Sequence, residues 1–115
     1  MDDNVSKRWG IVFYNDKVAS QIAELPPSIQ ADVLRILELI RQHGPNLGRP
    51  HTAPLGRGLF EIRAKGREGI ARSLFCQLVG QKIVILHTVI KKQMKLAKKD
   101  ILLAKKRMRE VKNHE

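Results

Sequence analysis

Two strand-like runs near the middle of the chain carry cationic side chains among apolar ones. Residues 59–65 and 70–79 flank the turn sequence GREG and contain Arg63, Lys65 and Arg72. If the four turn residues close a hairpin, Arg63 lies directly opposite Arg72 on the neighbouring strand. Two opposed like charges destabilise a sheet by about 0.2 to 1 kcal/mol unless an anion or a carboxylate lies between them. The spacing therefore predicts a sheet face that binds something negative.

A third strand-like run, residues 82–90, extends this face. With Gly80-Gln81 as a two-residue turn, Arg72 faces Val89 and Leu74 faces His87. Since side chains alternate along a strand, one face collects five cationic or imidazole groups, namely Arg63, Lys65, Arg72, His87 and Lys91. The opposite face collects an expected core of Phe60, Ile62, Ala64, Ala71, Phe75, Val79, Val84, Leu86 and Ile90. In an alternative interpretation, Glu61, which is expected on the same face, neutralises Arg63, and the other charges are ordinary solvated groups.

The remaining elements are expected on either side of these strands. Aromatic and β-branched residues from Trp9 to Tyr14 predict a first strand, after which Asn15 can cap a short helix. A second helix is expected to begin near Pro27 and to end at Gly44 and Pro45. Residues 45–58 hold three prolines and three glycines, which predicts an irregular loop. Residues 98–111 have the spacing of a helix with one apolar stripe, made of Ile101, Ala104, Met108 and Val111.

This order predicts an α+β fold of one domain spanning residues 1–115. An N-terminal strand and a helical hairpin are followed by three antiparallel strands and a C-terminal helix.

The charge of the chain favours a polyanionic partner. Twenty-two Lys and Arg residues against 11 Asp and Glu residues give a formal net charge of +11. Counting along the sequence gives −1 for residues 1–44, +5 for residues 45–90 and +7 for residues 91–115, which sum to +11. Nucleic acid is the first partner to expect, and an acidic protein is the alternative.

The sequence offers few ways to hold a metal or a cofactor. Cys76 is the single cysteine, so no internal disulfide and no thiolate zinc site can form. No pair of carboxylates or group of histidines has the spacing of metal ligands, and no cofactor is expected. No apolar run reaches the length of a membrane span, and the N-terminus does not read as a targeting segment. We therefore expect a cytoplasmic protein without membrane contact.

Four stretches of the chain resemble the RelE/HigB toxin superfamily, which also includes the ParE toxins, and most closely its phage-derived HigB-like branch. They are PLGRGLFEIRAKG at residues 54–66, IARSLF at 70–75, IVILHTVIKKQ at 83–93 and DILLAKKRM at 100–108. The resemblance implies a small RelE-like α+β domain and a toxin of a type II toxin-antitoxin system. It further implies metal-independent endonuclease activity on messenger RNA in the ribosome, which inhibits translation.

The resemblance also implies roles for particular residues. Arg63 and Arg72 match basic strand residues that hold the scissile phosphate, and Lys92 or Lys91 matches a further basic catalytic residue. Where some relatives carry a lysine, this chain has Glu61, and no tyrosine or histidine stands near the start of the final helix.

Attack of a ribose 2′-oxygen on the adjacent phosphate requires proton transfer, for which His87 is a candidate, with a structural role as the alternative. Contacts with RNA or the ribosome are expected from Lys65, Arg67, Lys91, Lys95, Lys98 and Lys99. The implied partners are the ribosome, messenger RNA and a cognate antitoxin of the helix-turn-helix, HigA-like kind.

Two other functions remain open at this point. A ParE-like toxin would share the fold and poison DNA gyrase without cutting RNA, so the fold cannot separate the two. A non-catalytic nucleic-acid-binding module is the third candidate. It lacks exposed aromatic stacking residues, because aromatic residues make up only 4% of the chain and are mostly expected in the core.

Overall fold

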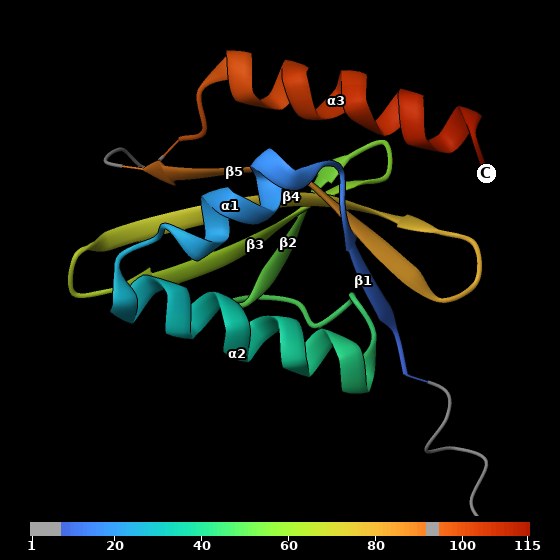
Figure 1. Cartoon of the computed structure of the whole chain (residues 1–115). Coiled ribbons are helices and arrows are strands. Elements are labelled where there is room, and N and C mark those ends of the chain that lie inside the picture. Colours follow the sequence, from blue (N-terminus) through green and yellow to red (C-terminus); the bar gives the residue numbers. More distant parts are fainter. Residues whose placement is uncertain (1–7, 92–94) are drawn as a thin grey trace, which may run out of the picture.

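Five strands form one mixed sheet between two layers of helices (Figure 1). The computed structural model describes residues 8–91 and 95–115. Its elements are β1 (Gly10–Phe13), α1 (Asp16–Ala23), α2 (Pro27–His43), β2 (Thr52–Gly56), β3 (Leu59–Gly66), β4 (Gly69–Leu78), β5 (Lys82–Lys91) and α3 (Lys98–Asn113). The strand order is β1-β5-β4-β3-β2, in which β1 runs parallel to β5 and the other neighbours are antiparallel. The predicted α+β architecture is confirmed.

The helical hairpin begins and ends at the residues that its chemistry predicts. The side chain of Asn15 accepts a hydrogen bond of 2.9 Å from the backbone N–H of Val18 and so caps α1. Pro27 is the first residue of α2, and Gly44 follows its last residue with a positive φ of 91°. A side chain at Gly44 would also press on Trp9, since a Cβ there would lie 3.1 Å from the indole nitrogen.

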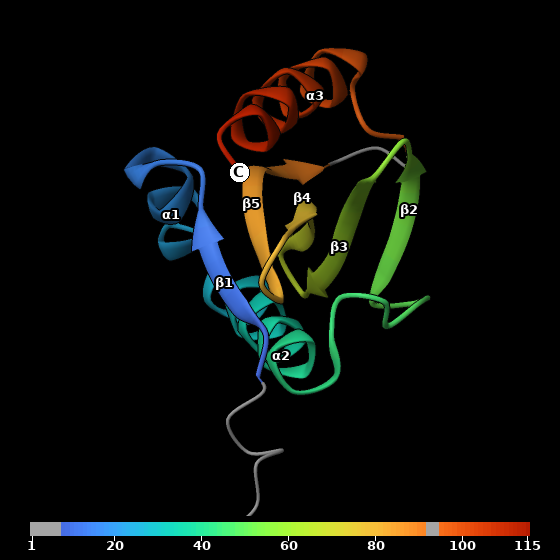
Figure 2. The ribbon, with the colours of Figure 1, turned by 90° about the vertical axis from the view of Figure 1, so that its right-hand side faces the viewer.

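Figure 2 shows α2 and α3 on opposite sides of the sheet, and an apolar core lies on each of its two faces. The larger core joins α1 and α2 to Ile62, Phe75 and Ile85 of the sheet. The smaller core lies beneath α3, where Ala104 and Met108 pack on Leu74 and on residues of β5. Ile101 and Val111 lie at its margin, so the predicted apolar stripe of this helix is confirmed. The part of the chain that the structure describes contains no helix long and apolar enough to cross a membrane.

The predicted register is confirmed for the hairpin and for half of the next pair. Arg63 pairs with Arg72, Arg72 with Val89, and Leu74 with His87. A bulge between Leu74 and Phe75 then shifts the register. The turn before β5 consequently holds three residues, 79–81, rather than the two predicted.

The bulge corrects part of the predicted core, because an extra residue resets which side chains share a face. Val84 and Leu86 are buried under α3 rather than beside Phe75. Two other predicted core residues are exposed for a different reason. Val79 lies in the turn after β4 and is 70% exposed, and Ile90 keeps its predicted pairing with Ala71 but lies near the end of β5, where it is 49% exposed.

The prediction that the whole segment 45–58 is irregular is wrong for its second half. Thr52–Gly56 forms β2, which pairs with the outer edge of β3. Proline has no backbone N–H to donate. Pro54 is tolerated because β2 is an edge strand, with one side on which no further strand needs a donor. Strand β2 therefore extends the sheet, and the irregular residues before it lie beside β3, where Arg63 donates its backbone N–H to the carbonyl of His51.

Candidate functional site

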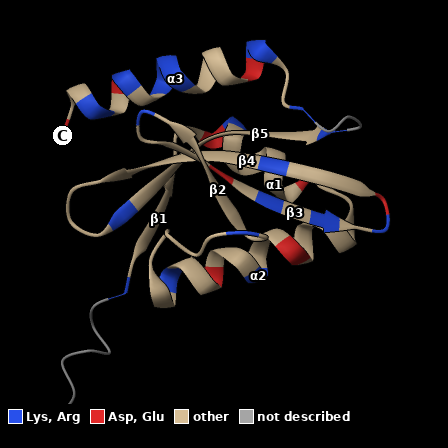
Figure 3. Cartoon of the chain, turned by 180° about the vertical axis from the view of Figure 1, so that it is seen from behind, with Lys and Arg blue, Asp and Glu red and all other residues tan. Residues whose placement is uncertain are grey.

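The confirmed pairing brings the predicted cations together in two neighbouring rows across the sheet. Arg63 and Arg72 form one row, and Lys65, Ile70 and Lys91 form the next. Because these residues alternate with core residues along their strands, their side chains share the face opposite α2. Figure 3 shows the basic residues of β3 and β4 on neighbouring strands and those of α3 above them.

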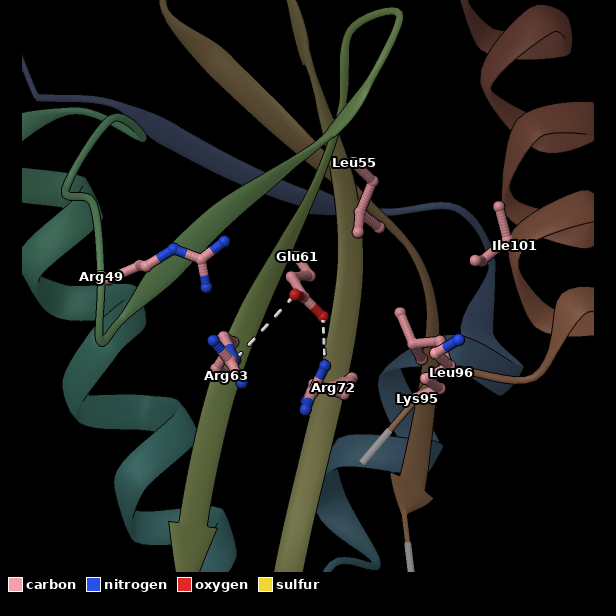
Figure 4. Close-up of a pocket in the computed structure, with 8 residues that line it drawn as sticks. All are labelled: Arg49, Leu55, Glu61, Arg63, Arg72, Lys95, Leu96 and Ile101. Carbon is pink, nitrogen blue, oxygen red and sulfur yellow. Dashed lines mark hydrogen bonds and ion pairs between the residues drawn. The ribbon is translucent and has the colours of Figure 1, made fainter. Parts of the chain in front are cut away.

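Glu61 contacts both arginines from the neighbouring row, where it pairs with Leu74 (Figure 4). Its Oε1 accepts a hydrogen bond of 2.8 Å from Nη1 of Arg72, and its Oε2 lies 3.9 Å from Nε of Arg63. Glu61 and Arg72 are both buried, at 5% and 4% exposure, whereas the side chain of Arg63 is 30% exposed. The carboxylate therefore occupies the position that the opposed arginines require for a negative group.

Lys91 places a further ammonium group near this pair. It is only 8% exposed, and its Nζ has no hydrogen-bond partner among the described residues. Burial, followed by the positive charge of Arg72, lowers the pKa of Lys91 below its ordinary 10.5, while Glu61 opposes part of the shift. A buried ammonium that no described acceptor contacts is suited to a phosphate oxygen or to proton transfer.

Two hollows open on either side of the arginine pair, and both are bounded by Arg63 and Arg72. The first has a volume of about 330 Å³ and extends toward α3, and its other lining residues are Arg49, Leu55, Glu61, Lys95, Leu96 and Ile101. The second has a volume of about 190 Å³ and extends toward the tip of the β3–β4 hairpin, where Pro50, Ala64, Lys65 and Ile70 line it. A chain crossing the arginine pair would thus find space on both sides.

His87 is placed elsewhere, under the start of α3. Its Nε2 lies 2.9 Å from Oδ1 of Asp100, and Leu74 on β4 separates its backbone position from that of Glu61. His87 lines neither of the two hollows. The geometry thus favours the structural alternative for His87, in which it anchors α3 to the sheet.

The other predicted site residues lie at different distances from the arginine pair. Lys65 and Lys95 line the hollows, whereas Arg67 lies in the turn between β3 and β4, where its backbone N–H donates to the hydroxyl of Ser28 on α2. Lys98 and Lys99 are exposed in the first turn of α3. Lys92, a predicted catalytic residue, lies outside the described residues.

Several lining residues are missing from the sequence-based prediction. Arg49 comes from the irregular segment before β2, and Leu55 from β2 itself, so neither can be placed when that segment is taken as a loop. Ile101 is predicted only as part of the core stripe of α3. Glu61 is predicted on the correct face, but its contact with Arg72 is not.

The arrangement offers charge and proton-transfer groups rather than metal ligands. Within residues 8–91 and 95–115, no cluster of three or more histidine, cysteine or carboxylate side chains could hold a metal ion. Two guanidinium groups, a buried ammonium and a carboxylate in contact with both arginines are suited to binding a phosphate and moving protons near it.

A family model matches most of the chain. The family model described as phage-derived protein Gp49-like (DUF891) matches residues 20–109, which include every element from α2 to β5, the second half of α1 and most of α3. The chain belongs to this family. The Gp49-like family is a HigB-like family of the RelE/ParE toxins. Membership of a toxin family implies an antitoxin partner. A comparison with curated proteins finds no match.

Proposed function

We propose that this protein is a HigB-like toxin that cuts messenger RNA in a ribosome-dependent, metal-independent reaction. One observation carries the proposal: Arg63 and Arg72 are opposed on neighbouring strands, and Glu61 contacts both. A purely structural sheet has no reason to keep two opposed arginines and a buried carboxylate on one face, because such charges cost desolvation energy. A site that must stabilise a pentacoordinate phosphate needs this concentration of positive charge.

In the proposed reaction, a ribose 2′-oxygen attacks the adjacent phosphorus and the bond to the 5′-oxygen breaks. The products are a 2′,3′-cyclic phosphate and a free 5′-hydroxyl group. Arg63 and Arg72 hold the non-bridging oxygens, since a guanidinium group is planar, bidentate and permanently charged. Because a guanidinium group stays protonated, neither arginine can serve as the base.

Glu61 and Lys91 are the proposed proton-transfer groups. The carboxylate of Glu61 accepts the proton of the 2′-hydroxyl, and the ammonium of Lys91 donates a proton to the departing 5′-oxygen. The lowered pKa of Lys91 makes it a stronger acid than a solvated lysine. Placing this acid beside Arg72 therefore serves both the charge and the proton requirement of the reaction.

The ribosome is proposed to supply the in-line geometry of the substrate. The site is open on both sides of the arginine pair, so it does not enclose the RNA chain that crosses it. Holding the reacting groups in line is worth many orders of magnitude in rate, and a host that already positions mRNA can provide it. The antitoxin partner is proposed to be a helix-turn-helix, HigA-like protein.

Primer extension on an mRNA in a reconstituted translation reaction tests this function. We expect wild-type protein to produce cuts that require ribosomes and Arg63→Ala to produce none. Arg63 is the preferred variant because it is partly exposed, and Arg41→Ala on α2 is the matched control because it removes an exposed arginine from the opposite face. Equal cutting of free RNA would contradict ribosome dependence, and intact mRNA in growth-arrested cells would point to gyrase instead.

A further inference from the structure

The larger hollow beside the arginine pair has two chemically different walls. Leu55, Leu96 and Ile101 contribute aliphatic side chains, and all three are partly exposed. Arg49 lies across the hollow from Ile101, and the floor between them carries Glu61 and the arginine pair (Figure 4). An apolar wall facing cations is unsuited to an inorganic ion alone, because an ion gains nothing from aliphatic contact.

The size of the hollow selects a small occupant. Its volume of about 330 Å³ is near the lower end of the roughly 300 to 1,000 Å³ typical of small-molecule sites. A flat heteroaromatic ring joined to a charged group fits such walls, with the ring against the aliphatic side chains and the charge toward the guanidinium groups. A nucleotide has this combination of parts.

We propose that the hollow is a nucleotide subsite that binds the base next to the cleaved phosphate. This inference rests on the proposed function. The base contacts Leu55, Leu96 and Ile101, and the exposed guanidinium of Arg49 binds the following phosphate of the same RNA chain. The subsite shares Arg63 and Arg72 with the cleavage site, so a base held there fixes which phosphate reaches the arginine pair.

The first test measures binding without cleavage. Methyl NMR spectra of the full chain are recorded while adenosine 5′-monophosphate or inorganic phosphate is added. We expect the nucleotide to shift the methyl signals of Leu55, Leu96 and Ile101, phosphate to leave them in place, and exposed Leu34 on α2 to respond to neither. Equal responses to both ligands, or no response to the nucleotide, would overturn the subsite.

The second test reads base preference from cut positions in the reconstituted translation reaction. Leu55→Phe narrows the hollow and Ile101→Ala widens it, while Leu102→Ala changes an exposed neighbour on the same helix. We expect the first two variants to redistribute the bases found at the cuts, and Leu102→Ala to retain the wild-type distribution. Two variants of opposite size are used because Ile101 also contacts the smaller core.

Arg49→Ala completes the second test. We expect it to raise the protein concentration needed for half-maximal cutting about tenfold, as removal of one charged hydrogen bond to phosphate would, without moving the cuts. Unchanged base distributions in Leu55→Phe and Ile101→Ala would overturn the subsite even if the wild type cuts mRNA. Absence of cutting by the wild type would contradict the proposed function, and the NMR titration would still decide whether the hollow binds a nucleotide.

Discussion

At the scale of single residues, Glu61 and Arg72 show why charge at this site is costly. Taking both groups out of water costs several kcal/mol per ion, and the ion pair at 2.8 Å offsets this cost while both partners are present. Breaking such a pair from one side destabilises a protein by about 3 to 5 kcal/mol. Alanine at Arg72 would therefore confuse loss of fold with loss of function, and substitutions that keep the shape are more informative.

Substitution Glu61→Gln is the sharpest test of proton transfer. It keeps the size of the side chain and a hydrogen-bond acceptor for Arg72, but removes the proton acceptor. We expect cutting to fall by about 100-fold or more, the usual contribution of a general base. Primer extension at saturating ribosomes measures the loss, circular dichroism confirms the fold, and Glu24→Gln at the exposed end of α1 serves as control. Full activity would show that Glu61 only positions Arg72.

The lowered pKa of Lys91 predicts that the wild type and a Lys91→Met variant differ in stability by an amount that depends on pH. The pKa of Lys91 is lower in the folded protein than in the unfolded chain, so the unfolded state binds more protons between the two values and the cost of burying the ammonium falls as pH rises. We expect Lys91→Met to raise the free energy of unfolding at pH 7, with a gain that shrinks toward pH 10.5. Urea denaturation of both proteins at several pH values measures this. A gain independent of pH would contradict the assignment.

At the scale of elements, the β3–β4 hairpin is held in place by the start of α2. Ser28 contacts the hairpin through its hydroxyl, which donates to Glu68 and accepts from the backbone N–H of Arg67. Asp32, one turn further along α2, accepts a hydrogen bond of 2.9 Å from the backbone N–H of Lys65. These contacts fix the strand that carries Arg63, so the orientation of the site depends on a helix on the opposite face of the sheet.

The close approach at Gly66 tests this dependence. A Cβ at Gly66 would lie 2.7 Å from the carbonyl carbon of Ser28 and 2.8 Å from the nitrogen of Ile29, and backbone atoms cannot move aside cheaply. We expect Gly66→Ala to lower the free energy of unfolding by about 1 to 3 kcal/mol, the usual cost of overpacking. Gly10→Ala is the matched control, since its Cβ would meet only Lys82 at 3.4 Å. Equal denaturation midpoints for both variants would contradict the prediction.

The anchor of α3 gives another prediction at this scale. If His87 and Asp100 act as one contact, His87→Gln and Asp100→Asn should each lower the free energy of unfolding by about 1 to 3 kcal/mol. The free energy of unfolding of the double variant should be no lower than that of the less stable single variant. Chemical denaturation of all four proteins completes the cycle. Loss of cutting in His87→Gln alone, with Asp100→Asn active, would instead return His87 to the catalytic group.

Local patterns account for most of the elements but for only part of the site. The cap at Asn15, the start of α2 at Pro27 and the opposition of Arg63 and Arg72 depend on residues close in sequence or joined by a short turn. Strand β2 has weak strand propensity and forms because the edge of β3 is available, which local sequence does not show. The bulge at Leu74 is a similar tertiary effect. Arg49, carried by the segment before β2, could therefore not be assigned to the site.

At the scale of the whole molecule, positive charge is concentrated on the side of the sheet that α3 covers. The outer surface of this helix exposes Lys98, Lys99, Lys106 and Arg109, and α2 lies on the other side of the sheet with its arginines paired to carboxylates (Figure 1). Ribosomal RNA presents a dense array of phosphates to any protein that enters its cavities. The exposed side of α3 is therefore expected to supply sequence-independent affinity, while the arginine pair supplies chemistry.

This division of labour predicts a separation of binding from cutting. Replacing Lys98, Lys99 and Lys106 by alanine should weaken ribosome binding and reduce the slope of log affinity against log salt by roughly 0.7 to 0.9 for each phosphate that the protein no longer neutralises. Cut positions should stay the same at saturating protein, because none of the three residues lines the hollows beside the arginine pair. The matched control replaces Lys17, Arg35 and Arg41, which removes the same charge from α1 and α2. If both triple variants reduced the slope equally, net charge alone would explain binding, and α3 would have no distinct role.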